Sequence, residues 1–480
     1  MSDQASISSP GLIKSARLPF IEKLAYGLGT TNEVWGNWLL PAMAWSLFGI
    51  YFQLSPEKIG LALLINRLAD AVSDPFFGWL SDNTRSRFGR RRPYILIGSI
   101  LSGIALPLFF FFLDTGWSEE SYFWYFTIGS SIFITLVSCF NMPYQSLGAE
   151  MTPDYDERTS VFTFKGVIQK IPEIATFAAA AFITLPMFFM DNGLPDMLAG
   201  ARVFSTILGI IMVVVGIFMF CTIKERYYEK VTEGNQDRVN ILATLGGALK
   251  CRPFVAQLCI ALAFGISTSM LGGIGYNLTV FYVCDGNATI GGQWNLWMGL
   301  AGTVLGVIGA MSYAKYALAT SKKASMFSIL ISGIVVFLAS WFFYNPALPF
   351  LQLLAAGTIA FVTAGFWTMY GAIGADIVDY DELQTGKRRE GAFSACGSYI
   401  MKFGLALGSW GSGLVLAWTN FDPALGGQQS AETFFNMRLA FAGIPILGIV
   451  VAIIALSAFG LTKKRSEEIR EQLEARRGEV

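Results

Sequence analysis

Three charged residues lie inside one long apolar stretch of the sequence: Arg67, Asp70 and Asp74. They are spaced by three and four residues, so on a helix all three side chains project from one face. A charge at bilayer depth costs roughly 2.5–3.5 kcal/mol, so this face must look onto a polar interior and not onto lipid. The charges sum to one net negative charge, which predicts a cation site. In the alternative, Arg67 and Asp70 neutralise each other, which would leave Asp74 unpaired.

Other ionisable and polar residues also lie within apolar stretches. Lys402 needs a carboxylate partner if it is buried, and Asp376 and Asp379 are the candidates close to it in the sequence. An ionisable residue inside a membrane span usually belongs to a functional site, so we expect Lys402 to have a functional role together with its partner.

Two further polar pairs have helical spacing. Glu33 and Asn37 are four residues apart, and Lys170 and Glu173 lie on either side of Pro172. Both pairs are expected to share one helix face. The second pair has two interpretations, as part of a binding site or as a buried ion pair that steadies the proline kink.

The composition is that of a polytopic membrane protein. Of 480 residues, 54% are hydrophobic and 14% are charged, whereas soluble proteins have about 25% charged residues. The net charge is zero, so nucleic acid is not an expected partner. The sequence has no histidine, and its six cysteines are scattered without metal-ligand spacing. We therefore expect neither an enzyme nor a bound cofactor.

Apolar windows of about 20 residues or more predict twelve membrane spans. The windows lie at 24–51, 57–82, 94–113, 122–150, 160–190, 201–222, 253–284, 288–318, 325–344, 348–379, 391–420 and 430–461.

Lysine and arginine set the orientation of these spans. The loops after even-numbered spans carry them at 85–92, 224–252, 322–323 and 387–389, whereas Lys58 is the clear case in the opposite loops. By the positive-inside rule, we expect both termini in the cytoplasm and the protein in the inner or plasma membrane.

The longest polar stretch between spans, residues 223–252, separates six predicted spans from the other six. The segment at 148–157, which begins Gly-Ala-Glu, is similar to the segment at 374–382, which begins Gly-Ala-Asp, and both end the fourth span of their half. Two such halves around a midplane cavity are the geometry of alternating access. The predicted divisions are an N-terminal half (1–222), a linker (223–252), a C-terminal half (253–461) and a charged tail (462–480).

Several motifs resemble one transporter family. They are Lys-Leu-Ala-Tyr-Gly-Leu-Gly at 23–29, Arg-x-x-Asp-Ala-x-x-Asp-Pro-x-x-Gly-Trp at 67–79, Arg-Ser-Arg-Phe-Gly at 85–89 and Ala-Asp-x-x-Asp-Tyr at 375–380. Together they resemble the glycoside–pentoside–hexuronide:cation symporters of the major facilitator superfamily, whose best-known members are the melibiose permeases. The resemblance covers nearly the whole chain. It implies an all-α membrane protein with twelve transmembrane helices in two pseudo-symmetric halves.

The resemblance assigns a cation site. In the family, the two second-span carboxylates bind the coupling ion, which here implies Asp70 and Asp74 with the hydroxyls of Ser73 and Ser138. Sodium is a hard ion that prefers several oxygen ligands, and these four groups make a plausible partial shell. The resemblance leaves Na⁺ and H⁺ open as the coupling ion.

The resemblance also implies a coupling set, and a loop latch in which Asp82 and the arginines hold the two halves together on the cytoplasmic side. Lys402 is expected to face the second-span carboxylates from the other half, and its pair with them would link ion occupancy to closure. The coupling set comprises Arg67, Lys402, Asp376 and Asp379, and the latch comprises Gly78, Asp82, Arg85 and Arg90. A solvated basic loop that sets topology is the alternative for the latch.

The sugar-side positions depart from the family pattern. The aligned positions hold Val34, Asn141, Gln145 and Gly166 in place of two acids, a tryptophan and an arginine, whereas Trp367 stands at a family aromatic position. Glu33 and Lys165 each lie one residue before a position, Val34 or Gly166, where the family has a charged side chain. On a helix, a step of one residue turns the side chain by about 100°. We predict a substrate cavity lined by Glu33, Asn37, Asn141, Gln145, Lys170, Glu173 and Trp367. A free lysine there would suit an acidic sugar, so a uronate or an oligosaccharide is expected as much as a neutral disaccharide.

The sequence therefore predicts a monomeric symporter that imports a sugar or glycoside with Na⁺ or H⁺ by alternating access. Its expected partners are the small-molecule sugar and membrane lipid. A cation-coupled lysophospholipid carrier and a proton-coupled sucrose-type carrier are the alternatives. A lipid carrier would have an apolar lateral cleft, and a sugar carrier a polar, aromatic-lined one.

Overall fold

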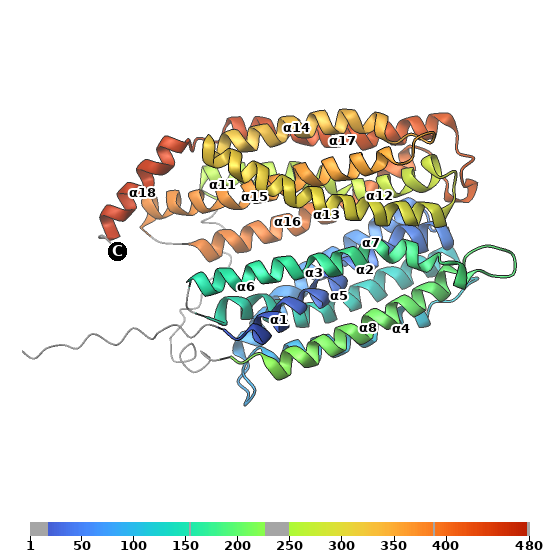
Figure 1. The fold of residues 1–480 in the computed structure, drawn as a ribbon, viewed down its shortest axis with the longest axis horizontal. Coiled ribbons are helices and arrows are strands. Elements are labelled where there is room, and N and C mark those ends of the chain that lie inside the picture. The colour runs from blue at the N-terminus through green and yellow to red at the C-terminus, as the bar shows by residue number, and fades with distance from the viewer. Residues whose placement is uncertain (1–17, 153–154, 226–248, 387–388, 478–480) are drawn as a thin grey trace, which may run out of the picture.

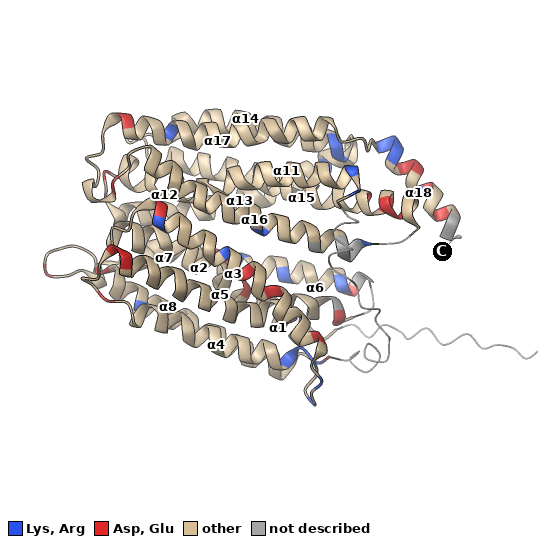
Figure 2. Ribbon diagram, turned by 180° about the vertical axis from the view of Figure 1, so that it is seen from behind, with Lys and Arg blue, Asp and Glu red and all other residues tan. Residues whose placement is uncertain are grey.

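A computed structural model describes residues 18–152, 155–225, 249–386 and 389–477. The chain forms two helical bundles that lie side by side with their helices nearly parallel (Figure 1). Most of the predicted linker, residues 226–248, lies outside the described residues. Figure 2 shows that charged residues are sparse along the middle of the helices and gather near their ends and on the last helix. This distribution is the one that a bilayer core requires.

The first bundle comes from the N-terminal half of the chain. Its elements are α1 (Phe20–Leu28), α2 (Thr30–Met43), the π-helix η1 (Ala44–Tyr51), α3 (Pro56–Asn83), α4 (Arg92–Phe111), α5 (Glu119–Glu150), α6 (Tyr155–Ile168), α7 (Lys170–Ile183), the short η2 (Pro186–Phe188) and α8 (Met197–Thr222).

The second bundle comes from the C-terminal half. Its elements are α11 (Arg252–Ser269), α12 (Leu271–Asn277), the π-helix η3 (Leu278–Val283), α13 (Ala288–Ala319), α14 (Lys322–Phe343), α15 (Leu351–Thr385), α16 (Glu390–Trp418), the short η4 (Pro423–Leu425) and α17 (Ala431–Ser457), followed by α18 (Lys463–Arg477) in the tail. We call the side where α1 begins and α18 lies the terminus side, and the opposite side the distal side.

Local sequence explains where many of these helices begin. Polar side chains accept a hydrogen bond from the backbone N–H three residues later and so cap five helices. These residues are Ser118 before α5, Asp196 before α8, Asn287 before α13, Ser321 before α14 and Ser430 before α17. At the other end of a helix, Gly386 stops α15 with a left-handed φ of 68°.

Ten helical stretches among the described residues are long and apolar enough to cross a membrane, compared with twelve predicted. The first two predicted windows, 24–51 and 57–82, are the two that do not meet these criteria of length and hydropathy. They form α1–η1 and the 28-residue helix α3, and both are helical over membrane-spanning lengths. Their polar residues, including Glu33, Arg67 and Asp74, explain why hydropathy alone does not select them.

The two halves share an unusual break in their first helical stretch. In the N-terminal half, Gly29 separates α1 from α2, and the stretch ends in a π-helix followed by Gln53 at φ 53°. In the C-terminal half, Met270 separates α11 from α12, and a second π-helix is followed by Asp285 at φ 50°. Because π-helical turns are uncommon and tend to occur at functional sites, this repeat supports equivalent roles for the two stretches.

The halves approach each other most closely near the distal side, where glycines let helix backbones touch. A Cβ atom at Gly60 of α3 would lie 2.8 Å from the backbone oxygen of Trp410 in α16, and one at Gly292 of α13 would lie 2.8 Å from that of Ala180 in α7. Across the same α3–α16 contact, Gly413 faces the carbonyl of Pro56. These contacts close the distal side.

We predict that Gly292→Ala opens the distal side, because the added methyl group must push α7 and α13 apart at a cost of about 1–3 kcal/mol. Nitroxide labels at Met187 and Leu425, in the distal loops of the two halves, should move apart in distance measurements. Gly443→Ala is the control, since a Cβ atom at Gly443 has nothing within 4 Å. An unchanged label distance would show that this contact does not hold the halves together.

Candidate functional site

An ion-paired cluster joins the two halves inside the membrane-spanning region. Lys402 of α16 extends to α3, where its Nζ lies 2.9 Å from Oδ2 of Asp70 and donates a short hydrogen bond to Oδ2 of Asp74. Both aspartates are buried, with 2% and 7% of their surfaces exposed. Their four-residue spacing on α3 lets one ammonium group contact both carboxylates.

Oxygen atoms remain available beside this ammonium group. The second carboxylate oxygens of Asp70 and Asp74 are buried without a hydrogen-bond partner in the described part of the chain. Ser73 and Ser138 are also buried, and their hydroxyl oxygens lie 2.8 Å apart. The structure therefore brings together the four residues that the resemblance assigned to the cation, two of them with unsatisfied anionic oxygens.

Arg67 forms no direct ion pair with Asp70, although its charge lies close enough to interact with both aspartates. Its guanidinium group donates a hydrogen bond of 3.0 Å to the carbonyl of Asn37 and lies 4.6 Å from the ring centroid of Trp38. Among the ion pairs of the described residues, none involves Arg67. Together, Arg67, Lys402 and the two aspartates sum to zero charge.

Asp376 lies apart from this cluster, which corrects its expected place in the coupling set. It pairs at 2.6 Å with Lys322 at the start of α14, within the C-terminal half. Asp379 follows one turn later on α15. Lys402 thus has its contacts across the halves and not with its neighbours in sequence.

The pair that Asp376 makes has a counterpart in the N-terminal half. Glu150 ends α5, and Arg91, just before α4, pairs with it at 2.7 Å. Glu150 and Asp376 occupy the same place in the repeated segments, and their partners precede or begin the preceding helix of each half. The repeat therefore encodes one terminus-side ion pair in each bundle.

The predicted loop latch does not join the halves in the described part of the chain, because its ion pairs stay within the N-terminal half. Asp82 lies 3.2 Å from Nη2 of Arg91 and 4.0 Å from Nη1 of Arg90, and Arg90 also pairs with Glu150. Arg85 is exposed, and a Cβ atom at Gly78 would have nothing within 4 Å.

Glu225 is a partner of this loop that sequence analysis missed. Its carboxylate accepts hydrogen bonds of 2.8–2.9 Å from the backbone N–H groups of Arg90, Arg91 and Arg92. It thus caps α4 from beyond α8, and such a distant cap leaves no local sequence signal.

A second polar cluster lies in the N-terminal half. Glu33 pairs with Lys165 at 2.8 Å and accepts a 3.3 Å hydrogen bond from Gln145. Asn141 is buried, and its side-chain oxygen has no hydrogen-bond partner in the described part of the chain. Asn37 donates instead to the backbone of its own helix, at Glu33. Lys165 belongs to this cluster, although it is not one of the residues of the predicted cavity.

A cavity of about 630 Å³ lies between α7 and the C-terminal half. Lys170, Glu173 and Trp367 line it, as predicted, but Glu33, Asn37, Asn141 and Gln145 do not. The predicted substrate set is therefore divided between this cavity, which receives residues of α7 and α15, and the polar cluster, whose predicted members lie on α2 and α5. Uncharged residues of the C-terminal half complete the lining, and sequence analysis missed them: Tyr276, Asn295, Thr303, Tyr344 and Thr363.

The lysines of these clusters are already neutralised. Lys170 donates to Glu173 at 2.7 Å, and Gln169 donates to the other oxygen of the same carboxylate at 2.9 Å. The expectation of a free lysine for an acidic sugar is therefore wrong for Lys170.

Comparison with known proteins identifies the family of this chain. A family model described as MFS/sugar transport protein matches residues 44–463. The putative glycoside/cation symporter YagG of Escherichia coli is 28% identical over 467 residues, with 95% of each chain covered. The isoprimeverose transporter of Lactiplantibacillus pentosus is 23% identical, with 96% of this chain and 94% of the relative covered. The glucuronide carrier protein homolog of E. coli is 27% identical, with 95% of each covered.

Solved structures share the fold. The nucleoside transporter NupG superposes with a TM-score of 0.63 at 13% identity and covers 92% of this chain and 99% of its own. The inward-open xylose transporter XylE from E. coli gives a TM-score of 0.62 at 14% identity, with 94% and 98% covered. The predicted major facilitator fold and the family resemblance are both confirmed. The chain belongs to the MFS/sugar transport protein family, and it is a multi-pass membrane transporter of the sugar symporter class, not an enzyme.

Proposed function

We propose that this transporter couples the movement of a neutral glycoside to a monovalent cation, Na⁺ or H⁺, bound at Asp70 and Asp74. The observation that carries the proposal is the pair of buried, unpartnered carboxylate oxygens beside the hydroxyls of Ser73 and Ser138. Buried anionic oxygens are costly unless an ion or a proton compensates them. The related putative glycoside/cation symporter supports a coupling cation.

Lys402 makes this site sensitive to the position of the two halves. Without a bound ion, its ammonium group compensates the carboxylates of α3, and the four interior charges cancel. A cation that enters adds one positive charge in a medium of low dielectric constant, and it weakens the attraction between Lys402 and the aspartates. Ion binding would thus loosen α16 from α3 and favour rearrangement of the halves.

The substrate is proposed to bind in the 630 Å³ cavity, whose volume is typical of small-molecule sites. The Trp367 ring offers an apolar face for a sugar ring, and the Lys170–Glu173 pair offers a donor and an acceptor for hydroxyl groups. Because Lys170 is paired, a neutral glycoside fits better than a uronate. The isoprimeverose transporter and the glucuronide carrier homolog among the relatives exemplify the two classes to be compared.

We further propose that the terminus side faces the cytoplasm, in the inner membrane of a bacterial cell. Basic residues gather on this side, at Arg90–Arg92, Lys322–Lys323 and Lys463–Arg465, as the positive-inside rule requires. Because the distal contacts are closed, we propose that this conformation exchanges substrate with the cytoplasm.

We predict that Asp74→Asn abolishes cation-driven accumulation of the glycoside, because the neutral amide removes one anionic ligand of the ion. Uptake into proteoliposomes under a Na⁺ or a proton gradient should fall by about tenfold or more, equivalent to roughly 1.4 kcal/mol. Asp114→Asn, the same change at an exposed loop residue, is the control. Gradient-driven uptake that survives Asp74→Asn would rule out this cation site.

We predict that Lys170→Ala raises the Kd of a neutral disaccharide by about tenfold, since it removes a donor and leaves Glu173 without its ionic partner. The Lys170→Ala/Glu173→Ala pair should be non-additive in a double-mutant cycle of substrate binding. Lys315→Ala, at an exposed lysine of α13, controls for loss of charge. If both single variants bind the disaccharide as the wild type does, the pair serves packing alone. Tighter binding of a glucuronide than of the neutral sugar would reverse the proposed substrate class.

A further inference from the structure

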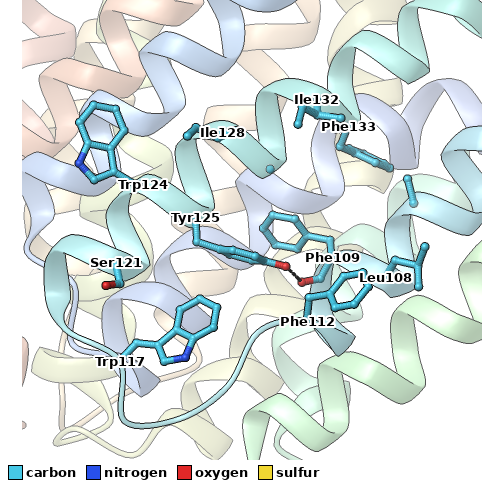
Figure 3. A pocket seen from close by; sticks show the side chains of 12 residues that line it. Leu108, Phe109, Phe112, Trp117, Ser121, Trp124, Tyr125, Ile128, Ile132 and Phe133 are labelled. Carbon is cyan, nitrogen blue, oxygen red and sulfur yellow. Dashed lines mark hydrogen bonds between the residues drawn. The ribbon is translucent and has the colours of Figure 1, made fainter.

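Two cavities differ in which parts of the chain surround them. The cavity in Figure 3, of about 520 Å³, is lined by α4, α5 and the loop between them, including the hydrogen-bonded Phe109 and Tyr125, so it belongs to the N-terminal half. The 630 Å³ cavity is lined from both halves, by Lys170, Glu173 and Phe177 of α7 and by residues of α12, α13, α15 and α17. Of the two, the 630 Å³ cavity is the one whose occupant can act on the contact between the halves.

The contact between α7 and α13 borders this cavity. Gly292, Asn295 and Gly299 are spaced by three and four positions on α13 and therefore share one helix face. Gly292 lies against the backbone of Ala180, and Gly299 leaves room for the ring of Phe177, which a Cβ atom there would overlap. Between the two glycines stands a side chain that can form hydrogen bonds, that of Asn295.

Asn295 bridges the two halves with its amide group. Its Nδ2 atom donates a hydrogen bond of 3.1 Å to the backbone carbonyl of Phe177. A carboxamide has two N–H donors and an acceptor oxygen, so this bond leaves one N–H and the oxygen for another partner. Asn295 is half-buried and lines the 630 Å³ cavity, where a sugar hydroxyl can be that partner. The same side chain therefore belongs both to the contact between the halves and to the cavity.

The sugar-binding groups proposed for α7 lie close to this bridge. Glu173 and Phe177 are four residues apart, so they share one face of α7 and are separated by about 6 Å along the helix. Lys170 precedes Glu173 by one turn and pairs with it at 2.7 Å. A disaccharide that binds Lys170 and Glu173 and lies along α7 thus extends toward Asn295 of the other half.

We propose that Asn295 is the residue through which a bound sugar holds the distal side closed. A sugar hydroxyl donates to the amide oxygen of Asn295 while other hydroxyls bond to Lys170 and Glu173, so the sugar joins α13 to α7. Because these groups lie near one another only when α7 and α13 are in contact, the sugar binds the distal-closed state more tightly and shifts the population toward it. This inference rests on the proposed function, since it takes the sugar to bind in the 630 Å³ cavity.

The proposal assigns a different ligand to each of the two contacts between the halves. The contact of α3 with α16 carries Lys402 and the two aspartates, where the cation is proposed to bind. The contact of α7 with α13 carries Asn295, where the sugar acts. A cation that loosens the first contact and a sugar that strengthens the second thus bias one rearrangement from two places.

The first test needs no sugar and uses the purified full-length protein with nitroxide labels at Met187 and Leu425. Asn295→Leu keeps the side-chain volume but removes the bridge to α7, so it should raise the ratio of distal-open to distal-closed distances about fivefold, as expected for one hydrogen bond. Asn295→Gln keeps the amide group and should stay within about twofold of the wild type. Asn83→Leu is the matched control, because the Asn83 amide donates to a carbonyl of its own helix. Wild-type distances in Asn295→Leu would overturn the bridge.

The second test adds isoprimeverose, the neutral disaccharide after which one relative is named. In the wild type, saturating sugar should shift the labels toward the distal-closed distance, and Asn295→Leu should reduce this shift and raise the Kd about fivefold. Lys170→Ala should also raise the Kd but leave the distances of the sugar-free protein unchanged, because Lys170 forms its ion pair within α7.

Three outcomes of the second test would count against the proposal. A sugar-induced shift and a Kd that Asn295→Leu leaves at their wild-type values would overturn the role of Asn295. A shift of the wild type toward the distal-open distance would overturn the proposed direction. A wild type that does not bind isoprimeverose would overturn the proposed function and with it the part of the sugar, whereas the sugar-free distances would still decide whether Asn295 bridges the halves.

Discussion

The ammonium group of Lys402 holds the two halves together at two buried carboxylates, and the account of this transporter depends on that contact. Asp70 and Asp74 belong to one bundle and Lys402 to the other, and they are separated by more than three hundred residues of chain. Three charges at this depth are tolerable only in combination, because each alone would be costly in the membrane. Any ion that competes for the carboxylates must therefore act on the contact between the halves.

Other features of the fold prepare the halves to move as units. Backbone contacts through Gly60 and Gly292 close the distal side, whereas the terminus-side ion pairs of Glu150 and Asp376 each stay within one bundle. The broken first stretches with their π-helices repeat between the halves. Extensive contacts between the bundles are concentrated at two helix pairs, α3 with α16 and α7 with α13. This division is what alternating access requires of a structure.

The fold and the burial of the α3 carboxylates could be predicted from the sequence, because hydropathy and three-to-four spacing are local signals. Asp70 and Asp74 are recognisable as a buried pair from these signals alone, but the partner of Lys402 required a family resemblance. The substrate cavity was predicted poorly. Thr303 and Thr363 attract no notice in an apolar helix, and Thr303 also bonds to its own helix backbone, as threonines commonly do. Glu33 of α2 and Lys165 of α6 pair with each other, and no local spacing signals a pair between two helices so far apart in the sequence.

The most direct test measures the thermodynamic coupling between ion and sugar binding in the purified protein. Titration of the glycoside with and without the cation, and of the cation with and without the glycoside, should give the same ratio of dissociation constants, because linkage is reciprocal. With both Asp70 and Asp74 replaced by asparagine, the account predicts that the ratio becomes one while the glycoside still binds. A ratio unchanged by the double replacement would contradict the claim that these carboxylates hold the coupling ion.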